Sequence, residues 1–229
     1  MKKTLLALAA LLVMGFRLAG AQNYKVEYDV KIKPDVFIGM MSTLGGLTED
    51  MMEPAKKGAE EMEIVFNVNM SEDKEDAQLV ARKSRFELNM NGIHIDMTDR
   101  LENIGFNYYK DHSANESYMK VNVLGKKYYV KSPAAREGKF TPVEGTRTIL
   151  GHECKLMKNS NNTKVWYATD IPFETKAYEG VPGLVLGIED ENFMNATAKS
   201  FKANDKEISI PKKAKVVTPL ELQKIMTGM

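Results

Sequence analysis

Three histidines and one cysteine are the side chains with the most obvious chemistry in this sequence. His94, His112 and His152 are scattered along the chain, and Cys154 is its only cysteine. On a strand, His152 and Cys154 would share a face, but two ligands do not complete a zinc site, which normally has four. No neighbouring group is placed to lower the pKa of Cys154, which is typical of a small buried hydrophobic residue. We therefore predict no metal site and no disulfide.

The sequence lacks the short motifs of the common enzyme classes. It contains no Gly-x-Ser-x-Gly elbow, Walker loop, dinucleotide fingerprint or His-Glu-x-x-His signature. Its acidic clusters, such as Glu189-Asp190-Glu191, are typical of solvated turns. We therefore predict no catalytic residues and no cofactor. An enzyme whose site is assembled from distant residues remains an alternative.

Methionine is frequent, with 15 residues in the chain. Thioethers are soft ligands that favour Cu(I), so a periplasmic copper-binding protein that uses Met and His94 is another alternative. On the strands predicted below, however, methionines occupy apolar faces, where they act as flexible core fillers. Those methionines are Met62, Met70, Met90 and Met97.

The first 21 residues have the three parts of a secretory signal peptide. Lys2 and Lys3 form a positive start, residues 5–16 are an apolar run, and Ala19-Gly20-Ala21 is a small-residue cleavage site. The apolar run is shorter than the roughly 20 residues of a spanning helix, which disfavours a retained anchor. We expect an exported protein that begins at Gln22 and lies in the periplasm or at the outer membrane.

The remaining residues, 22–229, are long enough for one sizeable core, and we expect a single domain. The whole chain has a formal net charge of +1, without the clustered basic excess of a nucleic-acid-binding surface. No later stretch is apolar enough to cross a membrane, so we predict no transmembrane span after cleavage.

Apolar and polar residues alternate with period two through most of the chain after the leader, which predicts strands. Asn91-Gly92 lies between two such runs and predicts a tight hairpin in which residue 90 pairs with 93 and 88 with 95. Gly125 predicts a second hairpin. Segments 71–77, 111–117 and 158–163 are polar and predict loops. The strands are expected at 24–32, 62–70, 86–90, 93–97, 104–110, 118–123, 126–131, 146–158, 163–168, 184–189 and 194–202.

Helical signals are few. Residues 49–62 have weak helical spacing, with Pro54 as a plausible start. Near the C-terminus, Thr218, Pro219 and Glu221 have the types and spacing of an N-cap, a first helical position and a capping-box acid. The expected fold is mainly β: one large, curved antiparallel sheet with one or two short helices on its concave face.

The most distinctive segment runs from residue 149 to 188. Pro182-Gly183 suits the centre of a type II turn with positive φ at Gly183, and it precedes an apolar run expected to be a central buried strand. We expect this motif to build a corner of the core. The competing interpretation is an exposed recognition loop.

This segment contains an Ile-Gly-Cys step, a tryptophan strand that ends near Thr-x-x-Ile-Pro, and a Gly-x-Pro-Gly-Leu run. The residues of these three elements are Ile149, Gly151, Cys154, Trp166, Thr169, Ile171, Pro172, Gly180, Pro182, Gly183 and Leu184. In these elements the segment resembles the GLPGLI family of exported Bacteroidota proteins. Val181 and Val185 replace the family's usual leucine and isoleucine, and Gly-Pro is absent after Pro172.

The resemblance implies a cell-envelope location and a half-barrel sheet like that of lipoprotein carriers, but no catalytic residues. A curved sheet partly covered by a helix is a natural hollow for an apolar ligand. We therefore expect a non-enzymatic envelope protein that binds a hydrophobic ligand or an envelope partner.

Overall fold

The computed structural model describes residues 23–43, 52–83, 87–90, 93–96, 105–123, 125–134, 138–210 and 213–227. The expected signal peptide (1–21) and the Asn91-Gly92 turn lie outside these ranges.

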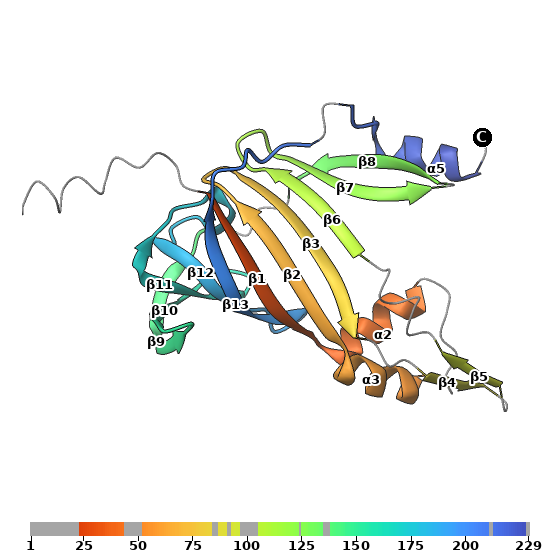
Figure 1. Cartoon of the computed structure of the whole chain (residues 1–229), viewed down its shortest axis with the longest axis horizontal. Coiled ribbons are helices and arrows are strands. Elements are labelled where there is room, and N and C mark those ends of the chain that lie inside the picture. Colours follow the sequence, from red (N-terminus) through yellow and green to blue (C-terminus); the bar gives the residue numbers. More distant parts are fainter. Residues whose placement is uncertain are drawn as a thin grey trace, which may run out of the picture.

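Twelve strands form one open sheet, and two more form a separate hairpin (Figure 1). Neighbouring strands of the large sheet are antiparallel, except that β14 pairs in parallel with β8. The order across this sheet is β14-β8-β7-β6-β3-β2-β1-β13-β12-β11-β10-β9. The strands are β1 (Asn23–Ile32), β2 (Glu63–Met70), β3 (Lys74–Lys83), β4 (Glu87–Met90), β5 (Ile93–Asp96), β6 (Gly105–Asp111), β7 (Glu116–Val123), β8 (Lys126–Pro133), β9 (Thr141–Ile149), β10 (His152–Lys158), β11 (Lys164–Pro172), β12 (Gly183–Glu189), β13 (Met194–Asn204) and β14 (Val216–Val217).

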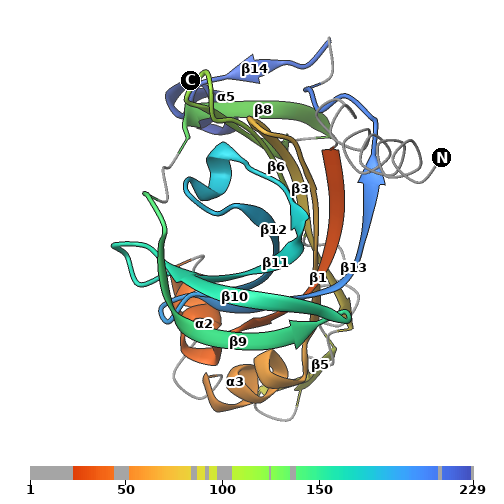
Figure 2. The ribbon, with the colours of Figure 1, turned by 90° about the vertical axis from the view of Figure 1, so that its left-hand side faces the viewer.

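The large sheet curves around a hollow, which confirms the expected fold class. Figure 2 shows residues 173–182, with the short helix η3 (Lys176–Tyr178), inside this hollow. Val181 from this segment shares a core cluster with Tyr28 of β1 and Phe66 of β2, so these strand residues face the concave side. Tyr28 also donates a 2.7 Å hydrogen bond to the Val185 carbonyl of β12. The core therefore lies on the concave side of the sheet, where residues of several strands pack together with Val181.

The described residues include three α-helices, of which two follow β1 in the chain and one lies against β8. Helices α2 (Pro34–Thr43) and α3 (Met52–Glu61) contact each other, and α3 lies beside β4. Helix α5 (Pro219–Thr227) packs Leu222 and Ile225 against Tyr128 and Val130 of β8. None of the described helices combines the length and the apolar character needed to cross a membrane.

The predicted hairpins agree with the structure where it describes them. In β4–β5, Met90 pairs with Ile93, and Leu88 pairs with Ile95. In β7–β8, Val123 pairs with Lys126, and Gly125 has the positive φ (76°) that such a turn needs.

Three other predictions need correction. Residues 146–158 are not one strand, because β9 and β10 form a hairpin in which Ile149 pairs with His152. Residues 71–77 are not all loop, since β3 begins at Lys74. Its apolar positions begin only at Ala77, so the alternation was too weak to detect. Helix α2 was missed because Pro34 and Gly39 are unfavourable helix signals, although proline suits a first helical turn.

Candidate functional site

Residues 173–182 form a loop, and residues of the distinctive sequence motif hold its two ends together. Pro172 at the end of β11 pairs with Gly183 at the start of β12, and Phe173 N–H donates to the Pro182 carbonyl at 3.4 Å. Leu184, at the start of the buried strand, is fully buried. Pro172, Pro182, Gly183 and Leu184 therefore hold the base of a closed loop that projects into the hollow.

The predicted turn at Pro182-Gly183 is wrong. The turn of this loop spans residues 178–181, where Val181 N–H donates to the Tyr178 carbonyl at 3.1 Å. Glu179 (φ −56°, ψ 124°) and Gly180 (φ 92°) have the backbone angles of a type II turn. Gly183 does not have positive φ. A Cβ there would instead lie 2.2 Å from the Ala168 carbonyl oxygen, so Gly183 allows two backbones to approach.

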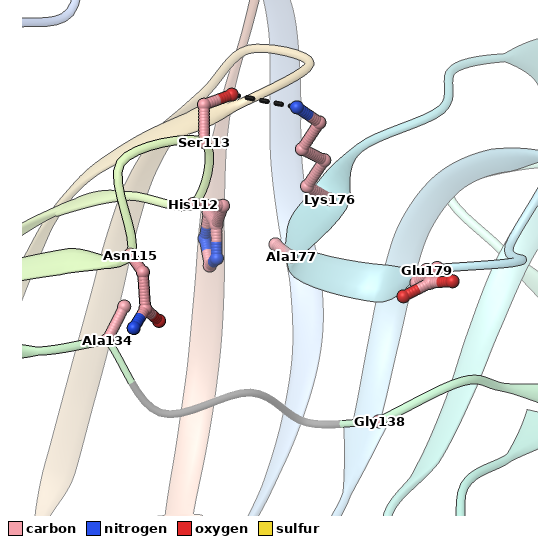
Figure 3. A pocket seen from close by; sticks show the side chains of 8 residues that line it. All are labelled: His112, Ser113, Asn115, Ala134, Gly138, Lys176, Ala177 and Glu179. Carbon is pink, nitrogen blue, oxygen red and sulfur yellow. Dashed lines mark hydrogen bonds between the residues drawn. The ribbon is translucent and has the colours of Figure 1, made fainter.

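A pocket of about 520 Å³ lies between this loop and the opposite side of the hollow (Figure 3). This volume is within the usual range for small-molecule sites, roughly 300–1,000 Å³. One wall comes from the β6–β7 turn and the end of β8, and the other from η3 and the turn after it. The lining residues are His112, Ser113, Asn115, Ala134, Gly138, Lys176, Ala177 and Glu179.

His112 is fixed on its wall by a buried carboxylate. Its Nε2 lies 3.0 Å from Oε2 of Glu75, which is only 4% exposed. Lys110, two residues earlier on the same face of β6, lies 3.8 Å from the same oxygen. A buried carboxylate is costly unless it is paired, and here the Lys110 ammonium group lies near it and the His112 ring is hydrogen-bonded to it. The bond through Nε2 leaves Nδ1 as the ring nitrogen that can contact a ligand.

The loop is tied to the opposite wall by Lys176. Its Nζ donates to Ser113 Oγ at 2.8 Å, and Ser113 in turn donates to Asp73 Oδ2 at 3.2 Å. The Lys176 backbone N–H donates to the Glu72 carbonyl at 2.7 Å. Beside it, Thr175 accepts a hydrogen bond from Ala177 N–H and caps η3. These bonds fix the width of the pocket.

On the concave face of the sheet, the strands are polar at the pocket and become apolar farther from it. Directly paired residues point to the same face, so the pairings Val68–Ala77, Ala77–Tyr108, Tyr108–Met119 and Met119–Val130 define an apolar row. His112 and Ala134 in the pocket are each four residues from this row, which corresponds to about 13 Å. Met119 is 44% exposed within the row.

The remaining motif residues lie outside the pocket. Cys154 is fully buried in the core, and burial raises the pKa of its thiol. Trp166 lies on the opposite face of the sheet, where its Nε1–H donates to Glu189 at 2.7 Å. Arg147 donates to the same carboxylate at 3.1 Å and stacks over the Trp166 ring at 4.4 Å. Burial lowers the pKa of Arg147.

The other two histidines are not in the pocket. His152 bonds through Nδ1 to Asp170 at 2.8 Å, and this bond lowers the pKa of that carboxyl. His94 pairs with Asn89 in the small hairpin, but its side chain is not described. Met70 is buried and Met62 packs against the core, whereas Met90 and Met97 lack described side chains. Among the described residues, no group of three His, Cys, Asp or Glu could hold a metal ion.

The sequence identified the motif residues at the base of the loop, but it did not identify most of the residues that line the pocket. Glu75 fell in a segment predicted as loop, and His112 is 37 residues away from it in the sequence. Lys176, Ala177 and Glu179 lie between recognised motif positions, and no spacing rule marks them. One signal could have found these three residues. The interval between Pro172 and Gly180 is bounded by two motif elements, and such an interval predicts a loop.

No family model matches the chain, and no curated protein matches it. Among solved structures, it is similar to PNGF-II in the C2 space group, with 16% identity and a TM-score of 0.45. The structure of PNGF-II in the P21 space group is also 16% identical, with a TM-score of 0.43. These similarities cover 90% of this chain but only 33% and 34% of those chains. The chain therefore spans about a third of the length of the proteins that it resembles in structure.

Proposed function

We propose that this is a non-enzymatic exported protein of the cell envelope that binds a hydrophobic ligand in the hollow of its sheet. The observation that carries the proposal is a pocket of about 520 Å³ on the concave side of the sheet, about 13 Å from an apolar row in which Met119 is exposed. A pocket of this volume is typical of small-molecule sites.

The location is part of the same proposal. The sequence of residues 1–21 supports export, and the motif that frames the loop supports membership of the GLPGLI family. The protein would then act in the periplasm or at the outer membrane. In this proposal the family motif builds the loop that narrows the hollow, and the ligand contacts the loop and the opposite strands.

The test is binding of N-phenyl-1-naphthylamine, a neutral apolar dye whose fluorescence rises when it leaves water. We expect Met119→Glu to raise the Kd at least about tenfold, because burial of a methionine side chain contributes roughly 1.5–3 kcal/mol. Val143→Glu is the matched control, since Val143 is 39% exposed and lies on β9, outside both the pocket and the apolar row that contains Met119. Equal effects of the two variants, or no dye binding by the wild-type protein, would contradict the proposal.

A further inference from the structure

Within the part of the chain that the structure describes, some of the charged groups around the pocket already have an oppositely charged partner, and others do not. Glu75 is compensated by Lys110 and is also hydrogen-bonded to His112. Asp73 accepts a hydrogen bond from Ser113, and this hydroxyl also accepts one from Lys176. Among the described residues, neither Lys176 nor Glu179 belongs to an ion pair. Lys176 and Glu179 are thus the two opposite charges that the pocket offers to a ligand.

These two charges lie at the two ends of η3 and its turn, with a small residue between them. Ala177 is buried and faces His112 across the pocket, as Figure 3 shows. The side chain of Ala177 is only a methyl group. The ammonium group has three donors and uses one on Ser113, so it can still donate to an anion.

The polar side chains of the opposite wall suit a ligand with both donors and acceptors. Asn115 supplies an amide, which both donates and accepts, and His112 supplies a ring nitrogen held in place by Glu75. A ligand with a single charge would satisfy only one of the two charges on the η3 side. A ligand that carries one anion and one cation satisfies both.

We infer that the pocket binds the head group of a zwitterionic amphiphile. Its anionic group is held by Lys176, with His112 and Asn115 on the opposite wall, and its ammonium group is held by Glu179. The amphiphile part rests on the proposed function, because the apolar chain is assigned to the row that contains Met119. The distance of about 13 Å between this row and the pocket is readily spanned by a medium-length alkyl chain.

The test uses four amphiphiles that share a twelve-carbon chain: dodecylphosphoethanolamine, dodecyl phosphate, dodecylamine and dodecanol. Each displaces bound N-phenyl-1-naphthylamine below its micelle-forming concentration. We expect the zwitterion to displace the dye at a concentration about tenfold lower than dodecyl phosphate or dodecylamine, which carry charge of one sign only, as one additional charge-assisted hydrogen bond predicts.

Two variants each remove one of the two charges. Lys176→Gln also removes the hydrogen bond to Ser113, so it is expected to weaken the phosphoethanolamine and phosphate compounds about tenfold more than it weakens dodecylamine. Glu179→Gln is expected to weaken the phosphoethanolamine and amine compounds and leave dodecyl phosphate unchanged. Lys155→Gln and Glu153→Gln, at exposed positions on β10, are the controls and should change none of the four.

Equal displacement by all four compounds would overturn the head-group assignment while leaving the proposed function intact. A preference for phosphate alone or for amine alone would also overturn it. A wild-type protein that does not bind the dye would contradict the proposed function itself, and this inference with it.

Discussion

At Gly183 the backbones of β11 and β12 lie too close together for any side chain. A Cβ there would be 2.2 Å from the Ala168 carbonyl oxygen and 2.8 Å from the Tyr167 ring. Because the oxygen belongs to a central strand, it cannot move aside without loss of pairing.

We expect Gly183→Ala to lower the free energy of unfolding by about 3 kcal/mol, the upper end of overpacking costs. Chemical denaturation measures this change. Gly39→Ala in α2 is the control, since a Cβ there meets nothing within 4 Å and alanine favours a helix by up to about 1 kcal/mol. Gly183→Ala with an unchanged midpoint would mean that the two strands can separate at little cost.

The sequence predicted that position 183 requires glycine, but it did not predict the physical reason for this requirement. The run from Glu179 to Gly183 contains two candidate type II turns, one centred on Glu179-Gly180 and one on Pro182-Gly183. Local rules accept both. The pairing of Pro172 with Gly183 decides between them, and that pairing is a tertiary contact. The partnership of Glu75 with His112 was unpredictable for the same reason.

At the scale of elements, the β9–β10 hairpin has an unusual turn. Leu150 (φ 52°) and Gly151 (φ 85°) both have positive φ, as a type I′ turn requires, yet leucine rarely adopts this conformation. Sequence rules expect Asn-Gly or Asp-Gly at such a turn, which is why this hairpin was predicted as one strand.

Leu150→Asn is therefore expected to stabilise the protein by roughly 0.5–1 kcal/mol, because asparagine tolerates the left-handed region and Leu150 is 43% exposed. Thermal unfolding measures the change. Leu150→Val is the comparison that should be destabilising, since a β-branched residue is worse at positive φ. A lower midpoint for the asparagine variant would show that the Leu150 side chain contributes packing that outweighs backbone strain.

The capping box of α5 was predicted correctly from local sequence. Glu221 accepts from the Thr218 backbone N–H at 2.6 Å, and Glu221 N–H donates to the Thr218 hydroxyl at 3.2 Å. The hydrogen bond from the Thr218 N–H lowers the pKa of Glu221. A carboxyl with a lowered folded-state pKa contributes stability above its unfolded pKa, and this stability is lost as the pH falls through the folded value.

The protection factors of the α5 amides, which correct for the pH dependence of intrinsic exchange, are thus expected to fall on acidification below the ordinary glutamate pKa. Glu221→Gln should be less sensitive to pH across this window, and Thr218→Ala should weaken the helix by about 1 kcal/mol at neutral pH. Protection factors in α5 that do not depend on pH in the wild-type protein would contradict the role assigned to the carboxylate.

At the scale of the whole molecule, the strand order could not be read from sequence. Alternation and short turns predicted an antiparallel sheet, and the sheet is antiparallel apart from β14. Nothing local indicates that β1 lies between β2 and β13, or that β3 pairs with β6 across the β4–β5 hairpin. These pairings depend on which curved arrangement buries Tyr28, Phe66 and Leu184 together.

The central claim is that the hollow between the 173–182 loop and strands β6 to β8 is the ligand site. The most direct measurement is hydrogen exchange of the wild-type protein with and without dodecylphosphoethanolamine. The account predicts added protection in residues 108–119, 130–134 and 173–181, and none in the β9–β10 hairpin. Protection confined to other segments, or no change at saturating ligand, would contradict it.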